Sequence, residues 1–410
     1  MTSESSPPAG TFHGLTIAPG ILAILEKSAY HTPTPIQQSA IQPGIEGKDI
    51  IGIAQTGTGK TLAFGIPMIQ RILQHGGHGL ILLPTRELAL QVDETFQKIG
   101  HSLGIRTAVL IGGASMHLQK QMIKQRPNVV IATPGRLIDH LEHRTITLSG
   151  VKILVLDEAD RMLDMGFMPQ INTILAQVPK QRQTMLFSAT MPQEIVQIAM
   201  KHMNLPIRVE VAPAGTTAER VSQELFIVTR EAKMQVLKHL LKEYPGSVLI
   251  FTRTKFGAKK LTRALKDEHY NSAEIHGNRS LAQRKEALGG FKTGLFRILV
   301  ATDIAARGID VTGIELVINF DMPDDPKDYV HRIGRTARAG RSGHAVTFVQ
   351  PDQMGGIRDI ERLIRAAIPR GNVPGIPGIL STPTSAASTQ SDHSARPSRP
   401  RRKAWRVHRR

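Results

Sequence analysis

The chain has 410 residues, enough for two domains of ordinary size. Hydrophobic residues make up 40% of it, which suits a folded core, and no apolar run reaches the roughly 18 residues of a membrane-spanning helix. The net charge of +18 favours a polyanionic partner, above all nucleic acid. Because cysteine is absent, disulfides and Cys-bound metals are excluded, and the polar first ten residues lack a signal sequence, so we expect a cytoplasmic protein.

In the first half of the chain, short β-branched runs end in turns that contain Gly, Thr or Asp, and amphipathic stretches such as 88–99 and 191–200 separate them. Alternation of this kind predicts a parallel β-sheet with helices on both faces. The runs expected to be strands are 49–53, 80–83, 129–132, 153–156 and 185–187.

The alternation stops near residue 206, and the segment VAPAGTTAER at 211–220 is small, polar and proline-containing, as linkers are. It then restarts, which predicts a second α/β domain of similar size with strands at 224–228, 248–251, 298–300, 316–319 and 345–349. Beyond 370 the chain is rich in Pro, Gly, Ser and Thr and then in Arg, which predicts disorder. The expected units are therefore 1–210, a linker at 211–222, 223–370 and a tail at 371–410.

Part of the positive charge belongs to the tail. Residues 381–410 hold eight Arg or Lys against Asp392, a net +7, which leaves +11 for residues 1–380. The body is therefore basic without its tail. The tail cations would tether structured RNA or a ribonucleoprotein near the body, although a merely solubilising tail has the same composition.

The segment AQTGTGKT follows the first predicted strand and opens a predicted helix. It fits the phosphate-loop pattern G-x-x-x-x-G-K-[ST], except that Gly52 or Ala54 stands where the first glycine usually falls. Backbone amides would wrap a phosphate at the helix N-terminus, Lys60 would reach the β- and γ-phosphates, and the Thr61 hydroxyl would contact Mg²⁺. The residues expected to bind nucleotide here are Ala54, Gln55, Thr56, Gly57, Thr58, Gly59, Lys60 and Thr61.

The sequence DEAD at 157–160 follows a predicted buried strand. A carboxylate at the end of a strand beside a phosphate loop is where a second Mg²⁺ ligand belongs, so Asp157 would hold the metal. Glu158 would orient or deprotonate the attacking water. Acidic residues at a helix N-terminus have the same appearance, but the phosphate loop favours the catalytic interpretation.

With these two motifs the chain resembles the DEAD-box RNA helicases, and their motifs follow in order from Phe12 to about Gly340. The compact core and short loops are most similar to the bacterial RhlE-type subgroup. The resemblance implies two tandem RecA-like domains, each a parallel sheet with helices on both faces, with ATP and RNA bound across the cleft between them.

The resemblance also assigns the nucleotide side of the cleft. Phe12 would stack on adenine and Gln37, within PTPIQ, would read its edge with an amide donor and acceptor. In ATDIAARGID, Arg307 would face the nucleotide and Asp310 would accept from the ribose hydroxyl. Isolated, an Asp in such a turn is more often a helix N-cap.

The RNA side comes from the motifs PTRELA, Gly-Gly, TPGRL, FTRTK, His-Gly and ATD. Backbone amides and arginines in these motifs would hold sugar–phosphate oxygens, although a plain turn or cap is the commoner role of any one of them. The residues implied are Pro84, Thr85, Arg86, Gly112, Gly113, Thr133, Pro134, Gly135, Arg136, Thr252, Gly277, Arg284, Thr302 and Asp303. The family often has Gln three residues before Arg284, but Leu281 stands here.

The segment HRIGRTARAG would place Arg332, Arg335 and Arg338 on one face of a helix. The resemblance makes Arg335 and Arg338 arginine fingers for the γ-phosphate and lets His331 link this segment to the DEAD motif. The family usually has Gly at Ala337, and we expect the methyl group to be tolerated.

Ser188 and Thr190 in SAT would couple the DEAD motif to strand separation, although ordinary capping hydroxyls fit the same spacing. The predicted function is RNA-stimulated ATP hydrolysis that drives local duplex unwinding or ribonucleoprotein remodelling, with ATP and Mg²⁺ as cofactors. The partners expected are RNA of low sequence specificity and, beyond it, ribosomal precursors or RNA-degradation machinery; no membrane is involved and the protein is expected to be a monomer.

Three alternatives remain beside this function. The first is a related motor that acts on DNA or moves 3′ to 5′. Such motors often carry His where Asp160 stands here, so Asp160 and the segment at 33–37 argue against it. An ATP-gated RNA clamp with little unwinding needs the same residues as a helicase. A phosphate-loop kinase or transporter ATPase has no use for the arginine segment of the second domain.

Overall fold

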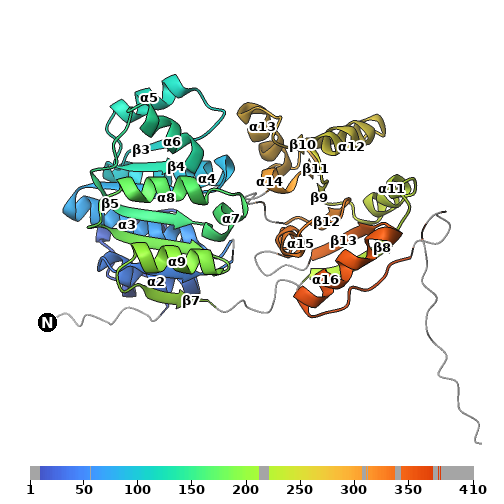
Figure 1. The fold of residues 1–410 in the computed structure, drawn as a ribbon, viewed down its shortest axis with the longest axis horizontal. Coiled ribbons are helices and arrows are strands. Elements are labelled where there is room, and N and C mark those ends of the chain that lie inside the picture. Colours follow the sequence, from blue (N-terminus) through green and yellow to red (C-terminus); the bar gives the residue numbers. More distant parts are fainter. Residues whose placement is uncertain are drawn as a thin grey trace, which may run out of the picture.

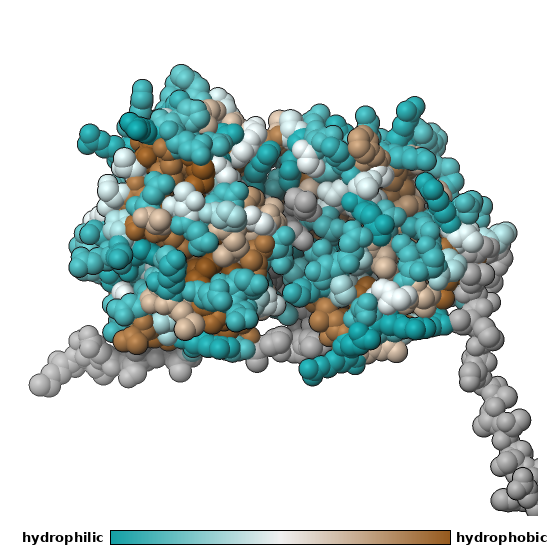
Figure 2. All heavy atoms as spheres, in the orientation of Figure 1, coloured by the Kyte–Doolittle hydropathy of each residue, from teal (hydrophilic) through white to brown (hydrophobic). Residues whose placement is uncertain are grey.

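The computed structural model describes residues 10–55, 57–211, 221–306, 311, 313–337, 343–372, 377 and 379. They form two α/β domains, each built on one parallel sheet (Figure 1). In the view of Figure 2 the apolar surface gathers mainly on the first domain, whereas much of the second domain is hydrophilic. In the described part of the chain, no helix is both long enough and apolar enough to cross a membrane.

The first sheet has seven parallel strands in the order β3-β4-β2-β5-β6-β1-β7. Parallel strands place all their carboxyl ends at one edge, which is where ligands bind in such sheets. The strands are β1 Ile50–Ile53, β2 His78–Leu82, β3 Thr107–Leu110, β4 Val129–Ala132, β5 Val151–Asp157, β6 Gln183–Ser188 and β7 Ile207–Glu210.

Neighbouring residues of these strands enter different cores. Ile81 belongs to the hydrophobic cluster that contains α3 and α4, whereas Leu80 and Leu82 belong to the cluster that contains α8 and α9. Both faces of the sheet are thus buried, as the apolar runs predicted. The helices are η1 Phe12–Gly14, α1 Pro19–Lys27, α2 Pro35–Ile45, α3 Lys60–His75, α4 Arg86–Gly100, η2 His101–Leu103, α5 Met116–Lys124, α6 Pro134–Glu142, α7 Ala159–Asp164, α8 Met168–Gln177 and α9 Gln193–His202.

The second sheet has six parallel strands in the order β10-β11-β9-β12-β13-β8, again with a separate core on each face. Its strands are β8 Val221–Ile227, β9 Val248–Phe251, β10 Ser272–Ile275, β11 Ile298–Ala301, β12 Leu316–Asn319 and β13 Gly343–Val349. Its helices are α11 Lys233–Glu243, α12 Lys255–Asp267, α13 Leu281–Lys292, α14 Asp303–Ala306, α15 Pro326–Ile333, η3 Pro351–Gln353 and α16 Met354–Ile364. The prediction of two tandem α/β domains is confirmed.

All ten predicted strands exist, with ends shifted by up to three residues. Three others, β3, β7 and β10, were missed because they are four residues long and mix polar with apolar side chains. Residues 212–220 of the expected linker lie outside the described part, and the second domain begins with β8 at Val221, inside the predicted linker. At the other end, the Gly371 amide donates to Leu225 of β8 and Ile379 bridges Val228, so these positions of the expected tail contact the sheet. Residues 381–410 lie outside the described part.

The arginine segment departs from the predicted single helical face. Helix α15 ends at Ile333, Arg332 points into the domain with 2% of its surface exposed, and Arg335 follows in a turn. The prediction of one helical face is therefore wrong for Arg332 and Arg335, because Gly334 caps the helix between them. Ala337 then has φ 54°, in the left-handed region that favours glycine.

We expect Ala337→Gly to raise the free energy of unfolding of the second domain by up to about 1 kcal/mol. The left-handed conformation costs a residue with a Cβ about 1–2 kcal/mol, and glycine removes this strain. Part of the gain is offset because glycine loses more conformational entropy than alanine on folding. Chemical denaturation of the full chain measures it. The control is Ala258→Gly inside α12, which should lower stability because that alanine is buried in a regular helix. A loss of stability in Ala337→Gly would contradict the strain argument.

Candidate nucleotide and RNA site

The phosphate loop leaves the carboxyl end of β1 and turns into α3. Gly57 and Gly59 have φ 85° and 90°, which lets the loop fold back so that Lys60 begins the helix. The Thr58 hydroxyl donates to the Gln55 carbonyl at 2.8 Å and holds the turn. Thr61 is the second residue of α3, and Thr56 lies outside the described residues. The amides of the first turn of this 16-residue helix lie at its N-terminus, where an anion would bind, and their role in holding phosphate stays a prediction.

Gln37 is joined to this loop. Its amide nitrogen donates to the Gly59 carbonyl at 3.0 Å, while its amide oxygen accepts from the backbone of Thr34 and caps α2. A Cβ at Gly59 would come within 2.3 Å of the Gln37 nitrogen, so that position requires glycine for space as well as for its φ. The structure therefore brings the predicted adenine reader against the phosphate loop. Phe12 lies buried in η1 with 3% of its surface exposed.

Lys60 and the first two acidic residues of DEAD form a buried cluster at the ends of β1 and β5. The Lys60 ammonium lies 2.7 Å from Oε1 of Glu158, 3.9 Å from Oδ1 of Asp157 and 3.2 Å from the Ala54 carbonyl. Arg161 pairs with the other oxygen of Glu158 at 3.1 Å. Glu158 has φ 55°, a strained conformation that turns the chain from β5 into α7.

The surroundings shift the pKa values of Asp157 and Glu158 in opposite directions. Burial raises the pKa of Asp157 to about 6, even with Lys60 nearby. Burial also acts on Glu158, but Arg161 and Lys60 outweigh it and lower its pKa to about 2. Glu158 is thus a paired carboxylate in this state.

The fourth residue of DEAD is bound to SAT. Both the backbone amide and the hydroxyl of Thr190 donate to the Asp160 carboxylate, at 2.8 and 2.9 Å, and the Asp160 amide donates to the Ser188 hydroxyl at 3.1 Å. The structure therefore brings together the two motifs that were predicted to be coupled.

Three predicted RNA motifs converge beyond the ends of β2, β3 and β4. The Arg86 guanidinium lies over Gly112 and Gly113, where a Cβ on Gly113 would come within 2.3 Å of it. The Arg136 guanidinium donates to the Ala114 carbonyl at 3.0 Å. Thr85 and Thr133 stand at the N-caps of α4 and α6, Pro84 precedes Thr85, and Pro134 and Gly135 open α6.

A buried polar network supports these loops, and sequence analysis did not identify it. His140 of α6 is fully buried, with Nε2 3.1 Å from Oε1 of Gln119 and Nδ1 2.7 Å from the Thr145 hydroxyl. Gln119 in turn donates to the Ile111 carbonyl, next to Gly112. The only sequence signal was a histidine on the inner face of an amphipathic helix, which has many possible partners. Burial, with Arg136 nearby, lowers the pKa of His140.

In the second domain, the residues predicted to contact RNA differ in their burial and in their bonds to other side chains. Asp303 is held by Arg332 through two bonds of 2.6 and 2.7 Å. Thr252 is buried and Thr302 begins the turn into α14, whereas Gly277 is exposed.

Arg335 is near enough to the first domain to lower the pKa of Glu158. His331 lies 3.9 Å from Asp328, and its Nδ1 has no hydrogen-bond partner among the described residues. Arg307, Asp310 and Arg338 lie outside the described residues.

The two domains touch through α4 and α13. Arg284, predicted to contact RNA, lies 2.8 Å from the Glu87 carboxylate of PTRELA, and both side chains are buried. Leu281, which stands in place of the usual Gln, packs against the core cluster of the first domain. In this state Arg284 therefore joins the domains, and the RNA-contact role stays a prediction.

Family comparisons agree with this geometry. Residues 34–198 match the model of the DEAD/DEAH box helicases, and residues 232–340 match the helicase conserved C-terminal domain. The chain is a DEAD-box helicase. The first match contains the phosphate loop and the DEAD–SAT contact, and the second contains α13 and the whole arginine segment at 331–340.

Relatives of this helicase occur in fungi and bacteria. It is 42% identical to the ATP-dependent rRNA helicase RRP3 of Candida albicans over 89% of this chain and 69% of that one. It is 46% identical to the ATP-dependent RNA helicase CshA of Listeria monocytogenes over 83% of this chain and 66% of the relative.

Solved structures give the same result. Dbp5 of S. cerevisiae, bound to RNA and ADP BeF3, matches with a TM-score of 0.79 at 30% identity over 88% of this chain and 96% of that one. Mss116p, bound to ssRNA and AMP-PNP, matches with a TM-score of 0.81 and 30% sequence identity, over 90% of this chain and 81% of that one. The predicted RecA-like domains are thus confirmed, and the chain is an ATP-dependent RNA helicase of this family.

We expect the helicase to lose stability as the pH falls below about 6.5, because His140 stays neutral in the fold while the unfolded chain takes up a proton there. The contribution of His140 to the free energy of unfolding is fully present above the pKa that this histidine has in the unfolded chain. It is lost as the pH falls towards the lower pKa that His140 has in the folded protein. Its slope is at most about 1.4 kcal/mol per pH unit. Denaturation of His140→Asn between pH 7.5 and 5 should show a shallower decline than the parent.

The matched control is His143→Asn, three residues further along and exposed, which should keep the parent slope. Equal slopes in the parent and in His140→Asn would contradict a neutral buried His140.

Proposed function

We propose that this helicase is a switch in which ATP binding takes Lys60 from Glu158 and closure of the second domain then activates Glu158 for hydrolysis. The observation that carries the proposal is the 2.7 Å pair between these residues at the base of the phosphate loop. While Lys60 neutralises Glu158, the carboxylate is a poor base and the lysine is unavailable to phosphate. A γ-phosphate competes for the lysine, so substrate binding itself prepares the base.

The metal-binding role falls to Asp157 and Thr61. Mg²⁺ prefers a carboxylate and a hydroxyl completed by waters and phosphate oxygens, and a buried carboxylate with a hydroxyl one residue past the phosphate-loop lysine suits that preference. Mg²⁺ bound there would neutralise charge on the β- and γ-phosphates. Phe12 and Gln37 would select adenine, and Arg307 and Asp310 would complete the nucleotide side.

Arg335 supplies the RNA-dependent part of the reaction. Its charge adds a smaller influence to those of Arg161 and Lys60 that lower the pKa of Glu158, and closure of the domains would carry the guanidinium to the γ-phosphate. Arg338 would act beside it, and His331 would connect the arginine segment with DEAD. The Asp160 contacts to Ser188 and Thr190 would transmit closure to the RNA surface.

RNA would bind along the carboxyl edge of both sheets. The residues that would hold its backbone are Pro84, Thr85, Arg86, Gly112, Gly113, Thr133, Pro134, Gly135, Arg136, Thr252, Gly277, Arg284, Thr302 and Asp303. Contacts to sugar and phosphate carry little sequence information, so binding would be unspecific and weakened by salt. Asp303 would act through Arg332, and Arg284 would have to leave Glu87 to reach RNA.

The cellular role is a further proposal. Similarity to an rRNA helicase favours ribosomal precursors as substrates, with RNA-degradation machinery as the other candidate. The compact core and short loops support an RhlE-type subgroup, a cytoplasmic location fits the lack of cysteine, and we propose a monomer. The units 1–210, 211–222, 223–370 and 371–410 are proposed as first domain, linker, second domain and RNA-tethering tail.

The alternative function is an ATP-gated RNA clamp, which uses the same residues but separates few strands. An unwinding assay on a short RNA duplex distinguishes the two. Strand release coupled to ATP supports the helicase, and ATP-dependent retention of the intact duplex supports the clamp.

We expect single-stranded RNA to stimulate ATP hydrolysis, since in the proposed mechanism closure on RNA brings Arg335 to the γ-phosphate. Steady-state hydrolysis with and without a single-stranded RNA measures this. Equal rates would refute the RNA-gated switch.

We expect Arg335→Lys to bind ATP as the parent does but to lose about 10³-fold in RNA-stimulated turnover, the lower end of the effect of arginine fingers in related phosphoryl transfer. Nucleotide affinity and turnover are measured on the same preparation. The control is Arg263→Lys, an exposed arginine on α12, which should change neither. Unchanged turnover in Arg335→Lys would remove Arg335 from the reaction.

A further inference from the structure

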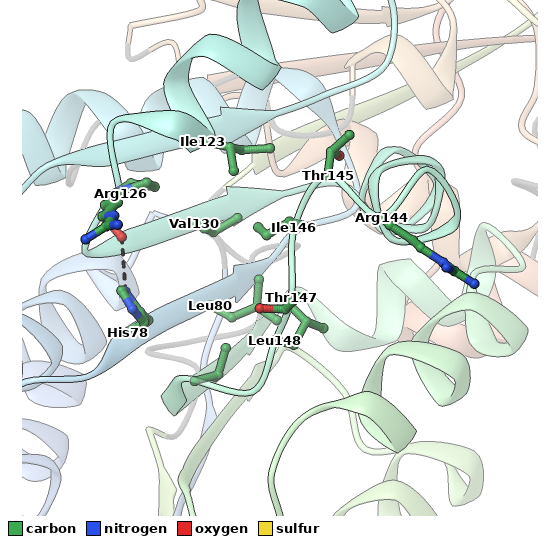
Figure 3. Close-up of a pocket in the computed structure, with 13 residues that line it drawn as sticks. His78, Leu80, Ile123, Arg126, Val130, Arg144, Thr145, Ile146, Thr147 and Leu148 are labelled. Carbon is green, nitrogen blue, oxygen red and sulfur yellow. Dashed lines mark hydrogen bonds between the residues drawn. The ribbon is translucent and has the colours of Figure 1, made fainter.

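The first domain has a groove that none of the catalytic or RNA motifs uses. Its volume is about 510 Å³, within the range of ligand-binding clefts. It lies between the ends of α5 and α6 (Figure 3), where apolar side chains from α5, from the strands and from the 145–148 loop form its floor. These side chains are Leu80, Ile123, Val130, Ile146, Leu148 and Val151.

The groove is at the amino ends of β2, β4 and β5, since His78, Val130 and Val151 line it. The phosphate loop and DEAD lie at the carboxyl ends of β1 and β5. The strands are parallel, so groove and catalytic site are on opposite edges of one sheet. A molecule in the groove would therefore not compete with ATP or RNA.

The rim of the groove is cationic. Arg126 stands at one end and Arg144 at the other, with His78 below Arg126 and bonded to the Pro127 carbonyl at 3.1 Å (Figure 3). No Asp or Glu is among the described residues that line it. An apolar floor between two separated positive charges is complementary to an apolar segment with carboxylates on both sides.

Both arginines hold a backbone position that favours glycine. Arg126 and Arg144 follow the ends of α5 and α6 with φ 51° each, in the left-handed conformation that commonly ends a helix with Gly. Glycine would form either turn with less strain. A cation also suits the negative end of each helix, so the observation that matters for binding is that the two arginines stand at opposite ends of one groove.

RNA and the chain's own tail fit the groove poorly. The floor lacks aromatic rings for bases to stack on, and its side chains are aliphatic. The segment 381–410 carries a net +7 and would be repelled by the rim. An acidic peptide meets both the charge and the apolar floor.

We propose that this groove, framed by Arg126 and Arg144, is the docking site for a linear segment of a partner protein in which two or three apolar side chains are flanked by Asp or Glu. Its apolar residues contact Ile123 and Ile146, and its carboxylates pair with the two arginines. The bound segment attaches the helicase to the partner while leaving the carboxyl edge of the sheet free for RNA.

The test is selection from a random linear peptide library displayed on phage against the full chain, followed by fluorescence anisotropy with the recovered peptides. We expect acidic–apolar peptides to be enriched and to bind about tenfold more weakly to Arg126→Glu/Arg144→Glu, since two attractions become repulsions. Recovery of no peptides, or of peptides that bind the double variant equally well, overturns the proposal.

Two matched controls isolate the groove. Arg365→Glu reverses the charge of an exposed arginine that also has a left-handed backbone, but on the second domain, and should leave peptide affinity unchanged. Ile123→Ser should weaken binding, whereas Leu118→Ser, an exposed position on the same helix outside the groove, should not. If Leu118→Ser or Arg365→Glu weakens binding as much, the groove is not the site.

Competition with RNA tests whether the peptide binds the groove or the RNA surface. Single-stranded RNA with AMP-PNP should not displace the peptide, and RNA-stimulated ATPase should be the same in the double variant as in the parent. Displacement of the peptide by RNA would place it on the RNA surface and overturn the proposal, whether or not the helicase activity itself is confirmed.

Discussion

The ion pair between Lys60 and Glu158 is the constraint on which the site depends. It joins the start of α3 to the end of β5, so the phosphate loop and the DEAD motif share one buried charge balance. Arg161 holds the second oxygen of Glu158, and Asp157 is left with a raised pKa beside a lysine that is already engaged. In the proposed mechanism nucleotide binding rearranges this pair, so that substrate binding and activation of the base are one event.

Two neighbouring motifs lie one or two residues from that pair. Gln37 bonds to Gly59, next to Lys60, and Asp160, two residues after Glu158, bonds to Thr190 of SAT. Glu87 of PTRELA pairs with Arg284 of the second domain in a separate contact. Polar contacts therefore join the phosphate loop to PTPIQ, DEAD to SAT, and PTRELA to the second domain.

Sequence reasoning was strongest where chemistry is local. The phosphate loop, the DEAD motif and long apolar strands have patterns that few other structures share, so the two domains and the position of Lys60 could be predicted. The partners of Arg284 and His140 could not, because each depends on a residue far away in the chain whose side chain has many possible contacts. The left-handed backbone of Ala337 was not predicted, because alanine itself gives no signal of positive φ and the glycine usual in the family was the only indication. The short strands β3, β7 and β10 carry too few apolar residues to stand out.

The parallel order of the first sheet has a consequence for how such an enzyme acquires new roles. The phosphate loop, the DEAD motif and the predicted RNA loops of the first domain lie at one edge, and the opposite edge is held by packing, turn geometry and hydrogen bonds such as that of His78 to Pro127. Residues at that second edge, such as the arginines after α5 and α6, belong to none of the motifs predicted to bind nucleotide or RNA. One fold can therefore keep the same nucleotide and RNA motifs at one edge while residues at the other edge determine which partner proteins it binds.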